Sequence, residues 1–201
     1  MTATIRKISI FQAAIDEHLA VTQRLLEQAA LLEQIATRMT AAVLGGGKVL
    51  WCGNGGSAAD SQHLAAELMG RFRRERRGLP SIALTTDTSI LTAVGNDYGY
   101  ERVFQRQVEA LCTVKDVLVG ISTSGNSKNV CAALEAARAI GAFTVALTGQ
   151  TGGSMAEIAE VSFRIASCDT ARIQEAHILC GHMLCDWVEL AVCGIGGLSG
   201  S

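Results

Sequence analysis

The sequence has little charge and almost no proline. Charged residues make up 18% of its 201 residues, against about 25% in an average protein, and there is one proline. Hydrophobic residues make up 49%. A chain of this composition is neither disordered nor collagen-like, and it can fill a sizeable core. We expect one domain, because compact domains usually hold roughly 100 to 200 residues.

Long apolar runs are missing as well. No uninterrupted stretch reaches the ~18 apolar residues of a membrane-spanning helix, although the mean hydropathy is +0.28. Asp16, Glu17 and His18 lie where a secretory signal needs an apolar centre. We therefore expect a cytoplasmic protein that does not contact a membrane, with its excess apolar surface buried between subunits.

The cysteines form no CxxC pair. There are seven, scattered through mostly apolar segments, which is typical of buried thiols in a reducing cytoplasm. The net charge of -2 gives no field that would attract nucleic acid. The one basic cluster is GRFRRERRG, residues 70–78, and its simplest interpretation is a solvated face at the end of a helix.

The periodicity of the sequence predicts an α/β fold. Apolar residues at helical spacing in residues 5–45 predict two N-terminal helices. Five later runs rich in valine and isoleucine predict buried strands: KVLWCG (48–53), SIALTT (81–86), DVLVGIS (116–122), FTVALTG (143–149) and VSFRIA (161–166). Helical stretches are expected at 57–72, 100–111, 126–140 and 170–192. Strands buried on both faces and separated by helices predict a three-layer α/β/α fold with a five-stranded parallel sheet.

The chain shows no linker that would divide it. We expect the helices of residues 1–45 to belong to the same domain as residues 46–195, and the Gly/Ser-rich residues 196–201 to form a flexible tail. The last predicted helix is apolar on most of its circumference, which a surface helix would not tolerate. The sheet and partner subunits are expected to cover it.

The loop after the third predicted strand is rich in hydroxyl groups. Ser122, Thr123, Ser124 and Ser127 supply four hydroxyls, and a predicted helix follows at once. In open parallel sheets, ligands bind beyond the carboxyl ends of the strands. Hydroxyl donors, free backbone N–H groups and the positive end of a helix dipole together make an anion site. An ordinary helix cap needs only one such residue, so we favour phosphate binding.

The loop after the first predicted strand leaves an alternative open. Residues 53–58, GNGGSA, fit the G-x-G-x-x-A fingerprint of dinucleotide-binding proteins. Such a site also needs an acidic residue about 20 positions further on, and the candidate, Asp87, lies well beyond that distance. Tight backbone packing explains the glycines nearly as well. A nicotinamide-dependent dehydrogenase is therefore the weaker interpretation.

Side chains able to carry chemistry gather in two predicted helices. His63 and Glu67 are four residues apart, so both project from one helix face. The last helix carries Gln174, Glu175 and His182. By helical phase, Glu175 is better aligned with His182 than Gln174 is. Spacing alone does not decide whether Gln174 or Glu175 points at a site. The set suits either a zinc ion with an open position or metal-free acid–base chemistry.

A further polar pair follows the second predicted strand. Asn96 and Asp97 lie in the segment GNDYG, which predicts a turn beside the loops described above.

At these residues the chain resembles the sugar isomerase (SIS) domain family and, within it, the phosphoheptose isomerases, which act on sedoheptulose 7-phosphate. The motifs that carry the resemblance span nearly the whole chain: CGNGGSAAD, the helix of residues 63–67, GRF, TAVGNDYG, GISTSGNS, ALTG and RIQEAH followed by GH. The resemblance implies a homotetramer with one zinc ion per subunit that forms D-glycero-D-manno-heptose 7-phosphate, the first step toward the heptose of bacterial lipopolysaccharide.

The resemblance also implies a role for each matching residue. The phosphate contacts would be Ser122, Thr123, Ser124 and Ser127. The sugar contacts would be Asn54, Gly55, Gly56, Glu67, Arg71, Asn96, Asp97 and Gln174. The zinc ligands would be His63, Glu67, Gln174 and His182, with Glu67 as the base and His182 as the acid.

One alternative comes from the same fold. Some similar proteins bind the bacterial replication initiator or sense a sugar phosphate, and the initiator-binding proteins lack the catalytic glutamate and histidine. This chain keeps both, at Glu67 and His182. The isomerase is therefore favoured over a regulator.

Overall fold

The computed structural model describes residues 2–196 of the chain. Five parallel strands form one sheet in the order β2-β1-β3-β4-β5. Their bounds are β1 Val49–Gly53, β2 Ser81–Ala83, β3 Val117–Ser122, β4 Phe143–Thr148 and β5 Val161–Arg164. All five lie within the runs predicted from the sequence. The expected flexible tail lies outside the described residues, apart from Gly196.

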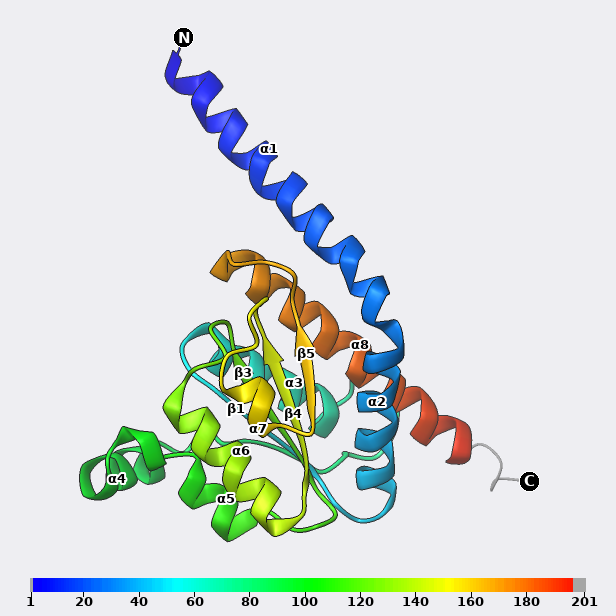
Figure 1. The fold of residues 1–201 in the computed structure, drawn as a ribbon. Helices are drawn as coiled ribbons and strands as arrows, with labels where there is room; N and C mark the ends of the chain where they lie inside the picture. Colours follow the sequence, from blue (N-terminus) through cyan, green and yellow to red (C-terminus); the bar gives the residue numbers. More distant parts are fainter. Residues whose placement is uncertain (1, 197–201) are drawn as a thin grey trace.

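Helices cover both faces of the sheet (Figure 1). The helices are α1 Thr2–Gln23, α2 Ala29–Leu44, α3 Gly56–Met69, α4 Thr88–Tyr98, α5 Gln105–Leu111, α6 Lys128–Ile140, α7 Met155–Ile158 and α8 Thr170–Gly196, with 3-10 turns η1 Arg24–Gln28 and η2 Tyr100–Arg102. Val117, Val119 and Ile121 of β3 pack in one core with α2, α3 and α8. Leu118 packs in the second core with α5 and α6. The three-layer α/β/α prediction is confirmed.

The two N-terminal helices are also confirmed, and they differ in setting. Helix α2 packs on the sheet and on α8, whereas α1 extends away from the body of the molecule (Figure 1). Apolar side chains of α1 are exposed: Ile10, Phe11, Ile15 and Leu19. This surface is typical of a helix that another chain covers.

Two predictions between β2 and β3 are wrong. Residues 88–98 form helix α4, which includes most of the segment GNDYG (95–99), where we expected a turn. Asp87 begins the helix by accepting a hydrogen bond from Ile90 N at 2.9 Å. The predicted helix 100–111 is divided into η2 and α5, because the chain bends at Val103 and Phe104 to bury both side chains in the second core.

The interpretation of the basic cluster is wrong in part. Residues 70–80 follow the end of α3 without helix or strand, and three of their five arginines meet acidic residues of α8. Arg73 and Arg74 pair with Asp186, and the Arg76 side chain is only 5% exposed beside Glu189. The cluster is therefore a loop held to α8 by ion pairs, not a helix end, and its exposed Arg71, Arg73 and Arg77 keep the predicted solvated face.

Helix α8 is long and apolar enough to cross a membrane by length and composition, over Thr170–Gly194. In the structure it lies against α2 and α3, and its residues Ile173, Ala176, Cys180, Leu184 and Val188 belong to the core. Helices in the core of globular domains meet the same criteria.

Candidate active site

The two loops singled out from the sequence lie side by side. Strands β1 and β3 are neighbours in the sheet although β2 lies between them in the chain, so their carboxyl ends form a topological switch point. Asn54, after β1, and Asn129, in α6, exchange two side-chain hydrogen bonds of 2.9 and 2.8 Å. Tyr100 donates to Asn54 Oδ1 at 3.2 Å. The hydrogen bonds join the two loops into one edge.

The hydroxyl groups of the second loop gather at one point. Ser122 Oγ lies 2.9 Å from Ser127 Oγ and 3.3 Å from Ser124 Oγ. Ser127 precedes α6, yet its side chain makes no cap hydrogen bond to the helix. A plain N-cap therefore does not account for the cluster, whereas an anion held by several hydroxyls would.

The hydroxyl loop is held by a neighbouring loop. Gly125 has φ +68°, and a Cβ there would lie 2.0 Å from Gly152 O, so only glycine fits. Thr123 and Ser124 line a cavity of about 330 Å³ together with residues after β4 and β5, among them Ser167 and Thr170. The loop thus has a fixed shape and an open polar side.

Three of the predicted catalytic and metal residues meet between α3 and α8. His63 Nε2 lies 3.0 Å from His182 Nε2 and 3.1 Å from Glu67 Oε1. One ligand atom from each of the three residues lies within 4.8 Å of the others. Donor atoms of this kind at this separation can hold a metal ion or pass a proton.

A glycine on α8 allows the two helices to come this close. A Cβ on Gly181 would lie 2.4 Å from Leu64 Cδ1, a separation that packed atoms do not reach. Leu64 follows His63, and Gly181 precedes His182. Close packing at the glycine therefore brings the two imidazoles together.

An aromatic ring covers His182. Phe72 stacks on it with ring centroids 5.3 Å apart and planes inclined by 21°. Burial lowers the pKa of His182, and the charges of His63 and Arg73 add to this effect while Glu67 opposes it. The imidazole is therefore neutral near pH 7, which is the form that binds metals.

The structure places Gln174 and Glu175 in different surroundings. Gln174 Nε2 lies 2.5 Å from the point that a Cβ on Gly56 would occupy, so Gln174 packs on the start of α3. Glu175 instead pairs with Arg172 and with His18 of α1, at 2.7 Å from His18 Nδ1. Of the two, Gln174 is therefore the residue that contacts the loop after β1.

Other predicted residues are not brought together in one chain. Asn96 and Asp97 are exposed in the last turn of α4, where Asn96 Nδ2 donates to Asp97 Oδ1 at 2.9 Å. Arg71 is exposed, and its Nε lies 3.8 Å from Glu75. Asp87, the ribose candidate of the dehydrogenase interpretation, caps α4 instead.

Sequence analysis missed two residues near the cluster. Phe72 gave no signal before the fold was known. Asp60 lies one turn before His63, and its Oδ2 is buried without a hydrogen-bond partner among the described residues. Burial raises the pKa of Asp60 to about 6, against the lowering effect of His63. The sequence signal that could have been read is the spacing of Asp60, which lies one turn before His63 and two turns before Glu67 on the same helix face.

Comparison with known proteins identifies the family. The SIS domain family matches residues 13–149. A phosphoheptose isomerase from Aquifex aeolicus is 54% identical over 184 residues, which cover 92% of this chain and 95% of the relative.

Solved structures agree with this match. The phosphoheptose isomerase from Neisseria gonorrhoeae is 45% identical, with a TM-score of 0.83 over 93% of this chain and 98% of that one. The enzyme from Francisella tularensis is 38% identical, with a TM-score of 0.83 over 94% and 99%. The chain belongs to the phosphoheptose isomerases of the SIS domain family.

Proposed function

We propose that this site converts sedoheptulose 7-phosphate to D-glycero-D-manno-heptose 7-phosphate through an enediol, the first step toward the heptose of bacterial lipopolysaccharide. The observation that carries the proposal is the meeting of His63, Glu67 and His182 between α3 and α8. The clustered hydroxyls of the loop after β3 support it. The membership in the phosphoheptose isomerases supports the reaction class.

The phosphate group is proposed to bind the loop after β3. Ser122, Ser124 and Ser127 present hydroxyls within hydrogen-bond distance of one another, and Thr123 lies in the same loop. Binding there anchors the substrate away from the reacting carbons, so the anchoring energy holds C1 and C2 near the base.

The proton transfer is proposed to use Glu67 and His182. An enediol forms when a base removes a proton from C1, and the aldose forms when the proton returns to C2. Glu67 Oε1 faces His63, so we assign the removal of the proton to Oε2. His182, neutral because of its lowered pKa, relays a proton between the substrate oxygens.

The donor set fits a zinc ion. Two ligands that share one zinc ion lie roughly 3 Å apart, because each zinc bond is about 2.0 to 2.1 Å. The separations of 3.0 and 3.1 Å around His63 Nε2 are close to this value. His63, Glu67 and His182 would hold the ion, with Gln174 as the fourth ligand. When bound, it would polarise the sugar oxygens.

The sugar is proposed to lie along the edge formed by Asn54, Gly55 and Gly56. Gln174 packs on Gly56 and would reach the same part of the substrate. Arg71, Asn96 and Asp97 are exposed in one chain, and we propose that neighbouring subunits bring such residues to each site.

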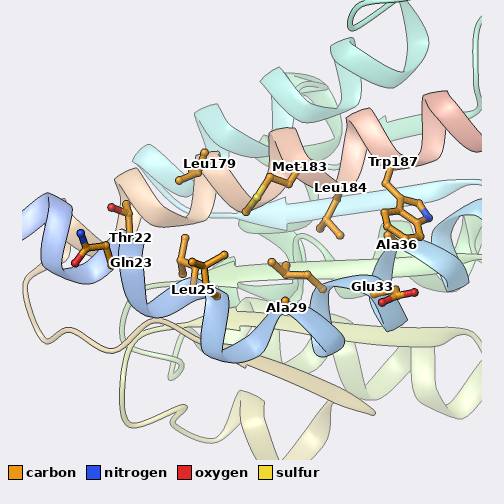
Figure 2. A pocket seen from close by; sticks show the side chains of 12 residues that line it. Thr22, Gln23, Leu25, Ala29, Glu33, Ala36, Leu179, Met183, Leu184 and Trp187 are labelled. Atoms are coloured by element: carbon orange, nitrogen blue, oxygen red, sulfur yellow. The ribbon is translucent and has the colours of Figure 1, made fainter.

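The oligomer is proposed to be a homotetramer. An apolar cavity of about 550 Å³ lies between α2 and α8, lined among others by Leu25, Met183 and Trp187 (Figure 2). Leu179, Met183, Trp187 and Leu190 of α8 and the apolar side chains of α1 are exposed. The helices of residues 1–45 would then act as one domain with residues 46–195. Sedimentation velocity measures the oligomeric state. A monomer at micromolar concentration would contradict the homotetramer.

A cytoplasmic location is proposed as well. All seven cysteines are free thiols, and four of them are buried, as expected in a reducing compartment. Cell fractionation checks this location.

The function is tested by following sedoheptulose 7-phosphate with the purified protein, before and after chelation. We expect an aldose product, loss of activity with chelator, and recovery with zinc. A ketose that stays unchanged with every metal would contradict the isomerase and favour a sugar-phosphate-binding regulator. Turnover that survives complete metal removal, checked by elemental analysis, would contradict only the zinc.

A further inference from the structure

A buried carboxylate on α8 lies at the centre of the contacts that hold one wall of the site. Glu189 is fully buried, with a side-chain exposure of 0%. Its Oε1 accepts a hydrogen bond from Phe72 N at 2.9 Å, and its Oε2 accepts from Arg73 N at 2.8 Å and Arg74 N at 2.9 Å. Three consecutive N–H groups on one carboxylate make an anion cradle of the kind that loops form around phosphate.

Arg76 balances the charge of this carboxylate. Its Nε lies 3.2 Å from Glu189 Oε1, and the Arg76 side chain is 5% exposed. The same guanidinium donates to the backbone oxygen of Glu67 at 2.9 Å and to that of Gly70 at 2.8 Å. Burial raises the pKa of Glu189, but the backbone N–H groups and Arg76 outweigh it and hold the pKa below its ordinary value.

Stability alone is a weak explanation for such a group. Neighbouring positions on this face of α8, Cys185 and Val188, are fully buried apolar residues. Replacing a buried ion pair by apolar side chains is often neutral or stabilising, so a buried pair needs another reason. Segment 72–74 has no helix or strand to satisfy its N–H groups, and Glu189 supplies the acceptors that fix its course.

The fixed segment carries the ring that touches the site. Phe72 stacks on His182, and His182 Nε2 lies 3.0 Å from His63 Nε2. Through Arg76, the same carboxylate is also linked to the backbone of Glu67. Glu189 is therefore connected to two of the three residues of the cluster without contacting the substrate loops.

We propose that Glu189 is a positioning residue of this site: it fixes segment 72–74 and so holds the Phe72 ring against His182. The proposal rests on the proposed isomerase function. Groups that orient a catalytic histidine or a metal ligand from behind typically change activity or affinity by roughly 10- to 100-fold when they are removed.

The test begins with Glu189→Gln, which keeps the shape of the side chain and removes the charge. The NH2 group of the new glutamine faces a backbone N–H group of segment 72–74. Two donors cannot form a hydrogen bond with each other, so the segment loosens. We expect kcat for sedoheptulose 7-phosphate to fall by roughly 10-fold or more, with little change in KM, because the phosphate loop lies at β3. An unchanged kcat in a folded variant would overturn the proposal.

Asp186→Asn is the matched control. Asp186 lies on the same helix and pairs with the side chains of Arg73 and Arg74, at 2.9 and 2.6 Å. Arg74 Nη1 also lies 3.5 Å from Glu189 Oε2, but the contacts of Asp186 are with guanidinium groups and not with the backbone N–H groups of residues 72–74, so its loss leaves the cradle intact. We expect normal kcat; a loss as large as that of Glu189→Gln would show that any ion pair to this loop has the same effect, and would overturn the specific role of Glu189.

A double-mutant cycle with Phe72→Leu tests the route. If Glu189 acts through Phe72, the double variant should lose little more kcat than the more damaged of the two single variants. If the fold-losses in kcat of the two single variants multiply in the double variant, the route through Phe72 is overturned.

A second readout needs no activity: the Cε1–H NMR signal of His182, shielded by the Phe72 ring, should move downfield in Glu189→Gln and stay in place in Asp186→Asn. An unmoved signal in Glu189→Gln would also overturn the proposal.

Two outcomes need separate treatment. If Glu189→Gln fails to fold, Glu189→Asp replaces it, since aspartate keeps the charge beside Arg76 and withdraws the carboxylate from the cradle; the same expectations then apply. If the parent protein does not isomerise the sugar, the proposed function fails, and the His182 signal still decides whether Glu189 positions the ring.

Discussion

His63 Nε2 lies 3.0 Å from His182 Nε2, although 119 residues separate the two histidines in the chain. The contact exists because α3 and α8 pack side by side, and Glu67, one turn after His63, joins it at 3.1 Å. Two imidazoles and one carboxylate thus meet at a point that no single segment of the chain could build. The expected chemistry of the protein depends on this meeting.

Replacing Glu67 should abolish turnover and leave the fold intact. Glu67→Gln keeps the volume of the side chain and removes the base, and a positioned base contributes roughly 10²- to 10⁴-fold to a rate. The measurement is kcat for sedoheptulose 7-phosphate, with circular dichroism as the check of folding. Retention of more than a tenth of the activity would remove Glu67 from the mechanism. We expect His182→Ala to behave in the same way.

Removing a hydroxyl from the loop after β3 should weaken substrate binding more than catalysis. A hydrogen bond to a charged group contributes about 1.5 to 3 kcal/mol, so Ser124→Ala and Ser127→Ala should each raise KM by roughly 10-fold or more. Ser89→Ala, in the exposed first turn of α4, serves as the control and should leave KM unchanged. Equal KM values in all three variants would place the phosphate elsewhere.

Adding one methyl group between α3 and α8 should lower both stability and activity. In Gly181→Ala the new Cβ would lie 2.4 Å from Leu64 Cδ1, so the buried Leu64 side chain or the two helices must shift. Overpacking of this kind costs about 1 to 3 kcal/mol, and each kcal/mol lowers Tm by roughly 2 to 4 °C in a chain of this size. Gly194→Ala is the control, because nothing lies within 4 Å of a Cβ there. Similar Tm values for the two variants would contradict the packing argument.

Stability should fall as the pH falls from about 6.5 to about 4. His177 is 1% exposed, and burial lowers its pKa to about 4 despite its hydrogen bond to Thr148 O. Between its ordinary pKa and this value the unfolded chain binds a proton that the folded chain does not. The free energy of unfolding therefore decreases with falling pH, by up to about 3 kcal/mol from this residue.

Urea unfolding at pH 7 and pH 5 checks this prediction. The parent protein should lose stability between the two values, and His177→Gln, which does not titrate, should lose less. The same loss in both proteins would show that other groups cause the pH dependence.

Local patterns in the sequence predicted most of the fold. Runs such as DVLVGIS marked the buried strands, because residues buried on both faces of a sheet are apolar throughout. Helix α4 escaped notice since its segment, TSILTAVGNDY, is rich in β-branched residues and ends in turn-forming ones, and none of its side chains is buried. The folding of that segment is decided by its cap at Asp87 and by its neighbours.

The site was predictable only where it is local. The gathering of hydroxyls at residues 122–127 could be predicted from the sequence, because four hydroxyls and a helix start are adjacent there. Helical phase favoured Glu175, whereas the structure places Gln174 against Gly56, since Arg172 and His18 bind Glu175. The stacking of Phe72 on His182 depends on a loop course set by Glu189, which no spacing in the sequence reveals.

The most direct measurement is proton NMR of sedoheptulose 7-phosphate in D2O with the parent protein and with Glu67→Gln. The account predicts an aldose anomeric signal and deuterium at C2 with the parent, because the proton that returns to C2 exchanges with solvent at the enediol stage. With Glu67→Gln it predicts neither. An aldose without deuterium at C2, or equal conversion by both proteins, would contradict proton transfer through Glu67.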